Sequence, residues 1–394
     1  MLGTYRDVLS RPGAALFSFT AMVSRFPLSM VGLGLVLVVS DRTGSYGQAG
    51  SVAAAYVLAA AALGPTQGRL TDKLGQAPVL LVVGALYAGG IALTLIAIDG
   101  DWATPWVHVC AALAGAATPQ TGSMVRARWT HVVTDRTQLN TAFSIEAILD
   151  EVVFLVGPVV VTFLTIQVSD FSGLAVAAVA ATLGSWALAA QRATAPPASE
   201  HTSTTRAPLS WSLLGRVVFA SVGLGVLFGS AEVIIVAFAT EEGQRGASGV
   251  VLAIWAAGSL LAGVVVGALP RTRDPLKRWR TSLLALSLLF LPLIFVSGIV
   301  WLSVGMFLAG FMISPTLIAS TSLVELHVAP SRLTEALTWA TTGLMVGVAP
   351  GAAIAGWVVD NHNASTAFVV PLVAGLAGSI VAFTLRPQAE PTAA

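Results

Sequence analysis

Charged residues are scarce in this chain of 394 residues. Lys, Arg, Asp and Glu together make up only 10% of it, whereas about a quarter of a typical soluble domain is charged. Hydrophobic residues make up 56%, and the mean hydropathy is +0.84. A chain with so little polar material cannot cover its own surface in water, so we expect lipid to be its solvent.

Cysteine and several enzyme motifs are also missing. Cys110 is the only cysteine, which excludes an intramolecular disulfide and any multi-cysteine metal site. The sequence contains no G-x-x-x-x-G-K-[ST] loop, no H-E-x-x-H and no G-x-S-x-G, and no sizeable soluble segment. The net charge of +1 is spread thinly. We therefore expect no enzyme activity, no ATP hydrolysis, no metal, no cofactor and no nucleic-acid partner.

What the chain does contain is a series of apolar segments of about 20 residues, long enough to cross a bilayer. We place them at residues 15–39, 46–66, 78–98, 104–125, 138–166, 171–190, 213–239, 247–269, 279–297, 299–325, 333–358 and 366–385. Only Ser297 and Gly298 separate the ninth segment from the tenth. Spans in lipid must be helical, so the fold class is an all-α polytopic membrane protein with twelve transmembrane helices.

The basic residues indicate the orientation of these spans. With the N-terminus inside, all of the 20 Lys and Arg residues are cytoplasmic except Arg25, Arg42 and Arg245. Both termini are then cytoplasmic in a multi-pass protein of the cytoplasmic (bacterial inner) membrane. The first apolar segment is too long for a cleavable signal peptide and is interpreted as the first span.

The chain divides into two halves. Residues 193–208 are rich in Pro, Ser and Thr, which predicts a flexible linker. We expect a six-helix bundle at 1–192, a cytoplasmic linker at 193–210 and a second bundle at 211–394. At a constant offset of 199 positions (249 − 50), Gly50, Tyr56, Gly64 and Gly68 correspond to Gly249, Trp255, Gly263 and Gly267. This favours a duplicated unit, although glycines that only pack helices are the alternative.

A loop between the second and third spans carries a recognisable pattern, GRLTDKLGQAPVL at residues 68–80. It resembles the signature loop of the major facilitator superfamily, and the matching positions are Gly68, Leu70, Asp72, Lys73, Gly75 and Leu80. Gln76 replaces the usual basic residue. The resemblance extends over the whole chain and implies two pseudo-symmetric bundles. It also implies that Gly68, Asp72, Lys73 and Gly75 form a conformational loop, which latches the outward-open state and does not bind substrate.

Two positions depart from the drug–proton antiporters of this family. Ala111 stands where those proteins carry an arginine before the glycine that corresponds to Gly115. Gly157 and Pro158 match part of their fifth-span motif, but three valines follow in place of the further glycines. Both departures weaken a direct assignment to drug export.

Charges inside the expected spans are the main candidates for a functional site. Arg25 and the pair Asp150 and Glu151 each lie about ten residues into a span, so about 15 Å deep. We expect Arg25 to pair with Asp150 or Glu151, and the pattern does not choose between them. Glu146 shares a helix face with Asp150, and we assign it to the cytoplasmic arginines Arg126 and Arg128. The pair of Arg25 with one of these acids is either a static structural ion pair, or a proton-sensitive switch or substrate-binding charge.

Two further groups of ionisable residues are candidates. Glu232 lies in the outer half of the seventh span, and is either a second proton-coupling or cation-coupling residue or a hydrogen-bonded structural acid. Glu325 and His327 correspond to Arg126 and Arg128 at the offset of 199. Together with Glu146 these residues predict a salt-bridged inner gate, although pairs at helix ends are often worth little.

Helix breaks predict the substrate cavity. In the family fold the first, fourth, seventh and tenth spans line the cavity, and each of these four spans is expected to contain a break. Transporters typically bind solutes where helices are interrupted, so these breaks indicate the cavity. The candidate residues are Pro27, Thr118, Pro119, Gln120, Ser230, Ser314 and Pro315, with aromatic walls from Tyr56, Trp255 and Trp339. Packing or lipid-facing roles are the alternative for each aromatic residue.

These features predict a secondary active transporter that moves a small organic solute by alternating access. We expect proton-coupled efflux by antiport, and proton-coupled uptake by symport is the first alternative. A non-transporting membrane receptor or scaffold of the same fold is the second. The expected partners are the solute, protons and membrane lipid, and the chain is expected to be a monomer.

Overall fold

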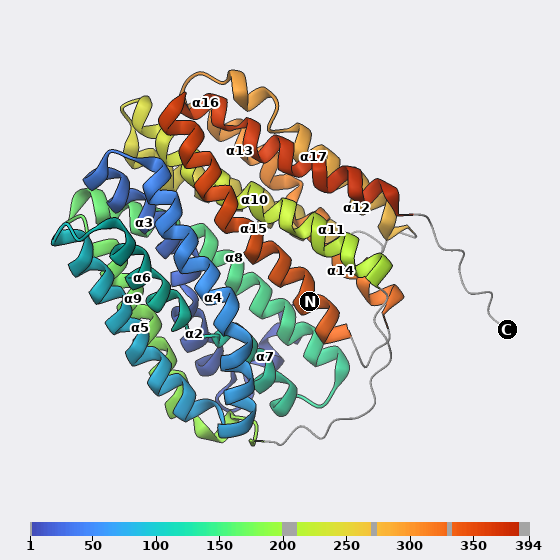
Figure 1. Ribbon diagram of the computed structural model, residues 1–394. Helices are drawn as coiled ribbons and strands as arrows, with labels where there is room; N and C mark the ends of the chain where they lie inside the picture. The colour runs from blue at the N-terminus through green and yellow to red at the C-terminus, as the bar shows by residue number, and fades with distance from the viewer. Residues whose placement is uncertain (1, 199–210, 269–273, 329–332, 386–394) are drawn as a thin grey trace. The chain divides into compact units, whose positions relative to one another are not determined.

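The computed structural model describes residues 2–198, 211–268, 274–328 and 333–385, and these residues are almost entirely helical (Figure 1). No strand occurs among them. The long helices follow from the apolar composition, because a helix satisfies all its backbone hydrogen bonds within one segment.

The first half of the chain forms nine α-helices within its described residues. These are α1 (Leu2–Leu9), α2 (Ala14–Arg25), α3 (Pro27–Thr43), α4 (Tyr46–Leu74), α5 (Gln76–Asp99), α6 (Thr104–Ala116), α7 (Thr121–Val132), α8 (Arg136–Gln167) and α9 (Ser172–Ala190), followed by the 3₁₀ turn η1 (Arg192–Thr194).

The described part of the second half is built in the same way. It contains α10 (Trp211–Glu241), η2 (Arg245–Ala247), α11 (Ser248–Ala268), α12 (Pro275–Leu288), η3 (Pro292–Phe295), α13 (Ile299–Phe311), α14 (Ile313–His327), α15 (Leu333–Asn361), α16 (Ala364–Ala367) and α17 (Val369–Thr384).

Among the described residues, eleven segments are long and apolar enough to cross a membrane, and each coincides with one expected span. The expected span at 104–125 is divided between α6 and α7, because residues 117–120 are not helical. Neither piece alone has the length of a span. The twelve-helix architecture therefore holds, with the fourth span built from two shorter helices.

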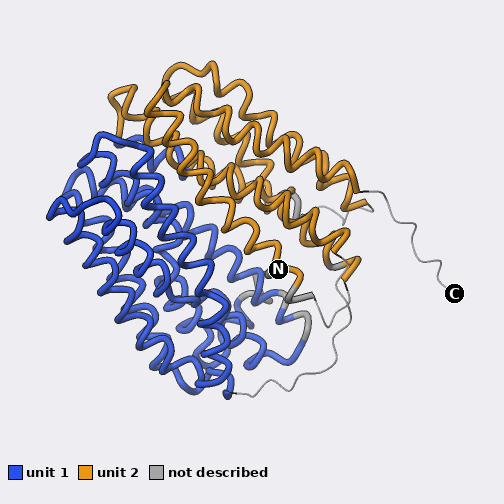
Figure 2. The backbone as a smooth tube through the Cα atoms, in the orientation of Figure 1, with its two compact units in different colours: residues 1–203, 246–253 blue, residues 204–245, 254–394 orange. Residues whose placement is uncertain are grey.

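The chain forms two compact units, shown in Figure 2. Unit 1 comprises residues 1–203 and 246–253, and unit 2 comprises residues 204–245 and 254–394. The first bundle was expected to end at residue 192 and the second to begin at residue 211. The main difference between this expectation and the observed units is that residues 246–253 belong to unit 1. Gly249 explains it, since a Cβ there would collide with the backbone oxygen of Pro158 in α8. Residues 199–210 of the expected linker lie outside the described residues.

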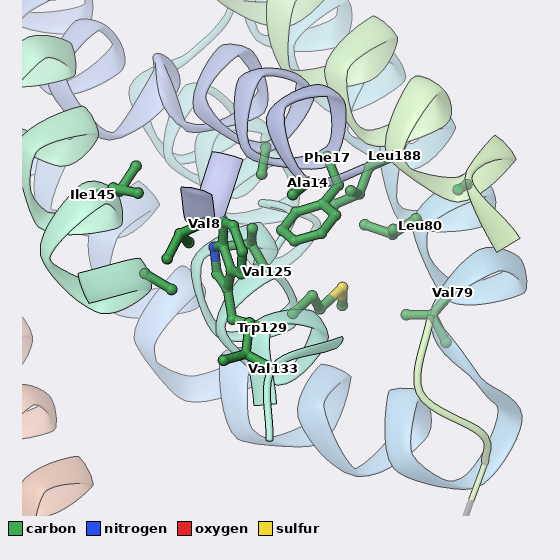
Figure 3. Close-up of a cluster of buried hydrophobic side chains, with 14 residues drawn as sticks. Val8, Ala14, Phe17, Val79, Leu80, Val125, Trp129, Val133, Ile145 and Leu188 are labelled. Carbon is green, nitrogen blue, oxygen red and sulfur yellow. The ribbon is translucent and has the colours of Figure 1, made fainter. Parts of the chain in front are cut away.

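Unit 1 contains a cluster of buried hydrophobic side chains, shown in Figure 3. Phe17 of α2 meets Trp129 of α7 edge to face, with ring centroids 4.7 Å apart. Val8 of α1, Leu80 of α5 and Leu188 of α9 are fully buried in the same cluster. The cluster holds Trp129 in one position, which matters because its ring nitrogen reaches a buried carboxylate described below.

Glycines bring α10 and α15 into backbone contact within unit 2. A Cβ on Gly225 would collide with the carbonyl oxygen of Leu344, and one on Gly229 with that of Val348. The expected break in the seventh span, beside Ser230, is wrong, because α10 runs without interruption from Trp211 to Glu241. Gly229 is there to allow close packing, and the buried Ser230 hydroxyl donates to the carbonyl of Leu227 at 3.0 Å.

Substituting Gly229 by leucine should therefore destabilise the protein by about 2–3 kcal/mol, because a backbone oxygen cannot move aside for a side chain. Thermal unfolding in detergent measures this. Gly215→Leu is the matched control on the same helix, since a Cβ at Gly215 meets no atom within 4 Å. Equal melting temperatures for the two variants would contradict the packing role.

One packing device occurs in both units. In unit 1 a Cβ on Gly115 would collide with the carbonyl of Tyr56, and in unit 2 a Cβ on Gly310 would collide with that of Trp255. Tyr56 and Trp255 are the aromatic positions that correspond at the offset of 199. The two glycines are 195 positions apart (310 − 115) and not 199, so the contacts show that glycines pack the helices in both units, and the duplication stays a prediction.

Candidate functional site

Arg25 is the centre of a buried charge network in unit 1. It is the last residue of α2, and its side chain is only 2% exposed. Its Nε donates to the carbonyl of Ala21 at 3.1 Å. Its Nη1 donates to Asp150 Oδ1 and its Nη2 to Glu146 Oε2, each at 2.7 Å. The guanidinium thus bridges two carboxylates that lie four residues apart on one face of α8.

Glu146 is the buried end of this network. Its side chain is fully buried, and three donors reach it. Ser18 Oγ lies 2.6 Å and Trp129 Nε1 lies 2.9 Å from Oε1, while Arg25 binds Oε2. The expectation that Glu146 pairs with Arg126 and Arg128 is wrong. One cation and two neutral donors thus hold this carboxylate in a site that is closed to solvent.

Asp150 is the exposed end. Its side chain is 30% exposed, and it is shared by two arginines. Oδ1 accepts from Arg25, and Oδ2 accepts from Arg126 Nη2 at 2.9 Å. The Arg126 side chain is 41% exposed, and its Nη1 also donates to the carbonyl of Gly122 at 3.0 Å. The choice that the sequence left open is therefore resolved in favour of Asp150 as the partner of Arg25.

Glu151 points elsewhere on α8. Its side chain is half-buried, and the described part of the chain contains no ion pair that includes it. Successive helical residues point about 100° apart, so Glu151 cannot share the position of Asp150. It remains a candidate only because it adds a third carboxylate close to the network.

Arg128 does not lie at an exposed rim. It is fully buried, and its donors are used inside unit 1. Nε reaches Gln76 Oε1 at 2.7 Å, and the two Nη atoms reach the carbonyls of Gln191 and Leu188 at 2.7 and 2.8 Å. Nη1 also donates to Thr194 Oγ1 at 2.9 Å. The first residues of the expected flexible linker are thus packed in η1, and Arg128 is not available for the expected gate in this structure.

The contact with Arg128 explains why Gln76 departs from the family pattern. Gln76 is buried, accepts from Arg128 and donates its own Nε2 to the carbonyl of Met124 at 3.0 Å. A basic residue here would face a buried guanidinium. We expect Gln76→Arg to destabilise the protein by about 2 kcal/mol or more, measured as a loss of melting temperature in detergent.

Gln76→Glu is the matched control for this substitution. It keeps an oxygen acceptor for Arg128 but loses the Nε2 donor to Met124, so it should melt between Gln76→Arg and the unmodified protein. If Gln76→Arg melted no lower than Gln76→Glu, the explanation would be wrong.

The break in the fourth span is real, and several of its polar groups are hydrogen-bonded within unit 1. Thr118 Oγ1 donates to the hydroxyl of Tyr56 at 2.9 Å, and that hydroxyl lies 3.3 Å from the hydroxyl of Tyr87. Gln67 of α4 donates to the carbonyls of Ala116 and Thr118. Tyr56, Thr118 and Pro119 are buried, and Gln120 is half-buried beside Gly64. These residues hold the broken helix together before they could contact any solute.

The other expected cavity residues are mostly buried. Pro27 begins α3, and the tenth span breaks at Met312, ahead of Ser314 and Pro315. The hydroxyl oxygens of Ser314 and Ser259 lie 2.9 Å apart and share a hydrogen bond. In unit 2, Trp255 packs edge to face on Phe228, and the exposed Trp339 packs on Trp211. Glu232, the second coupling candidate, is half-buried in α10.

The expected conformational loop lies at the end of α4. Asp72 and Lys73 are exposed in its last turn. Gly75 has a φ of 84°, which glycine adopts without strain, and it separates α4 from α5.

His327 is exposed at the end of α14, with Nδ1 2.9 Å from the carbonyl of Leu323. The side chain of Glu325 lies outside the described residues, so the gate stays a prediction.

Comparison with known proteins places this architecture in a family. The model of the Major Facilitator Superfamily matches residues 17–328 and 281–394 in two overlapping stretches. The chain belongs to the major facilitator superfamily. An uncharacterized MFS-type transporter of Sinorhizobium fredii is 25% identical over 99% of both chains.

Solved structures of this superfamily share the fold at low sequence identity. A peptide transporter, POT, solved with sulfate, has a TM-score of 0.74 at 14% identity and covers 95% of this chain and 93% of its own. The nucleoside transporter NupG has a TM-score of 0.69 at 15% identity, covering 93% and 98%. The human organic anion transporter MFSD10 has a TM-score of 0.64 at 14% identity, covering 96% and 99%.

Family membership makes this protein a membrane-embedded transporter of a solute and not an enzyme. It also gives the buried network a context. Charged residues inside membrane-spanning helices are costly and are associated with transport pathways. The signature loop at residues 68–80 and the twelve expected spans had already indicated this family from the sequence.

Proposed function

We propose that this protein is a proton-coupled secondary transporter of a small organic solute in the cytoplasmic membrane, with both termini in the cytoplasm. The observation that carries the proposal is Asp150. It is a partly exposed carboxylate in the middle of a membrane-spanning helix, and it is shared by Arg25 and Arg126.

The difference between the two acids supports this role. The Glu146 side chain is fully buried and accepts from three donors, whereas the Asp150 side chain is 30% exposed. A proton on Asp150 would remove the negative charge that Arg25 and Arg126 share, and it would weaken both contacts at once. Such a group can couple proton binding to a change in the position of α7 relative to α8.

The relatives support the solute class and not its identity. The structural neighbours are named for peptides, nucleosides and organic anions, which favours a small organic solute. The distribution of basic residues supports the orientation. Alternating access between two bundles is the mechanism that the duplicated fold supports.

Gly157 bears on the direction of transport. The Gly157-Pro158 pair matches part of the fifth-span motif of the drug–proton antiporters, and that match alone would favour antiport. In the structure a Cβ on Gly157 would collide with Ser29 Oγ, which donates to the carbonyl of Val153 at 2.8 Å. Since close packing of α3 on α8 accounts for Gly157, this pair no longer favours antiport over symport.

Reconstituted protein tests the proposal. Proteoliposomes that contain a pH-sensitive dye would be exposed to a library of small organic solutes under an imposed pH gradient. We expect at least one solute to produce proton movement that a protonophore abolishes. Solute flux without any proton movement would contradict the coupling, and binding without flux would favour a receptor.

The orientation can be tested with single cysteines, since Cys110 is buried and is the only one. In a Cys110→Ser background, Ser10→Cys should react with an impermeant thiol reagent only from inside, and Asp101→Cys only from outside. The reverse pattern would overturn the assigned topology. Both parent positions are exposed.

A further inference from the structure

We propose that Arg25 and Arg126, with the first turn of α7, form a binding site for an oxyanion in the place that the Asp150 carboxylate now occupies. The ligand class is a carboxylate or a phosphate-like group. As the natural ligand we infer an anionic group on the transported solute, and this inference rests on the proposed function. The binding itself is testable without transport.

The geometry of the two guanidiniums supports the site. Arg25 Nη1 and Arg126 Nη2 approach the two oxygens of one carboxylate, at 2.7 and 2.9 Å. They come from different helices, α2 and α7, and Asp150 comes from a third, α8. The pair therefore recognises a planar two-oxygen anion already, and Asp150 serves as the built-in ligand.

The backbone next to these arginines favours an anion too. α7 begins at Thr121 inside the broken fourth span, and no side chain caps its first turn. A helix N-terminus carries partial positive charge. Gly122 in that turn lies between the two arginines, because a Cβ there would come within 3.3 Å of Arg126 Nη1 and 3.8 Å of Arg25 Cδ. Because Gly122 has no side chain, nothing at this position covers the guanidiniums. Arg25 itself is only 2% exposed, so an external anion must displace the Asp150 carboxylate to reach it.

Charge balance determines when an external anion can enter. The network contains two guanidiniums, Arg25 and Arg126, and two carboxylates, Glu146 and Asp150. Glu151 on α8 adds a third carboxylate nearby. Among the described groups that form ion pairs with these arginines, which do not include Glu151, a proton on Asp150 leaves one uncompensated positive charge, and a bound anion would neutralise it. Protonation and anion binding thus reinforce each other, so the proton and the anion travel together, which is symport.

Chemical rescue tests the site directly. We expect Asp150→Ala to lower the melting temperature in detergent, because it leaves two cations close together. Potassium formate, and potassium sulfate for the tetrahedral class, should raise the melting temperature of Asp150→Ala by about 3 °C or more above potassium chloride at equal ionic strength. Rescue by formate alone assigns the carboxylate class, and rescue by sulfate alone assigns the phosphate-like class.

The double variant Asp150→Ala/Arg126→Ala is the matched control. It lacks one of the two guanidiniums, so formate and sulfate should give no shift beyond that of chloride. An equal shift in both variants, or none in Asp150→Ala with either anion, would overturn the site. Formamide, which resembles formate without its charge, should also have no effect.

The unmodified protein provides the same test should Asp150→Ala fail to fold. Stabilisation by formate or sulfate relative to chloride should grow as the pH is lowered and Asp150 takes up a proton. Stabilisation that is absent at every pH would overturn the site. These measurements need no flux, so a failed anion site and a failed transport proposal are distinguishable.

Discussion

Replacing Arg25 by glutamine is expected to destabilise the protein by about 3–5 kcal/mol, more than any other change in the network. The substitution leaves Glu146 with no cation in a site that is fully closed to solvent. A buried carboxylate without its counter-charge must be protonated or must draw water into the bundle, and either costs free energy. Unfolding by heat or by denaturant in detergent measures this loss of stability.

A second substitution distinguishes this explanation from a general loss of packing. The double variant Arg25→Gln/Glu146→Gln removes the cation and the buried charge together, so it should recover much of the lost stability. Ser18 and Trp129 would still have a neutral oxygen to bind. A double variant that was less stable than Arg25→Gln would show that charge pairing is not what holds α2 to α8.

Asp150→Asn is expected to uncouple solute movement from protons. An asparagine keeps an oxygen for the arginines but carries no titratable charge, so it should fold and still expose the same surface. Solute accumulation driven by a pH gradient should fall by roughly tenfold or more, while exchange of solute between the two sides of the membrane persists. Proteoliposomes with and without an imposed gradient provide the measurement.

Glu151→Gln is the matched control for that experiment. It removes the adjacent carboxylate on the same helix, and the described residues show no ion pair for Glu151. Proton-driven accumulation should therefore continue. If Glu151→Gln uncoupled the protein and Asp150→Asn did not, the assignment of the coupling residue would be wrong.

Much of the fold was predictable from sequence because lipid simplifies the problem. A span must be a helix of a certain length, so hydropathy alone located the helices. The interruption at 117–120 was also predictable from Pro119. The break expected in the seventh span was wrong, because a glycine such as Gly229 is compatible with a kink and with a close helix contact. Only the neighbouring carbonyl of Val348 distinguishes the two cases.

The charge network was predictable in part. Depth along the helices brought Arg25 to the level of Asp150, and the helical wheel placed Glu146 and Asp150 on one face. Depth could not show that one guanidinium would span both acids. It placed Arg128 with Glu146, whereas Arg128 turns toward Gln76 on α5.

Several functional contacts had no clear signal in the sequence. Ser18 lies seven residues before Arg25, two helical turns along the same face, and this spacing could have indicated a polar partner for the buried acid. Trp129 and Gln67 gave no such hint, because aromatic and amide side chains occur throughout apolar spans. Their roles depend on the neighbours that the fold brings to them.

The central claim is that Asp150, and not Glu146, is the member of the network that gains and loses a proton. Carbodiimides modify protonated carboxyl groups, and mass spectrometry of the α8 peptide can assign the modified residue. We predict modification of Asp150 that rises as the pH is lowered, with Glu146 unmodified because it is closed off by three donors. Modification of Glu146 that equals or exceeds that of Asp150 would contradict the account.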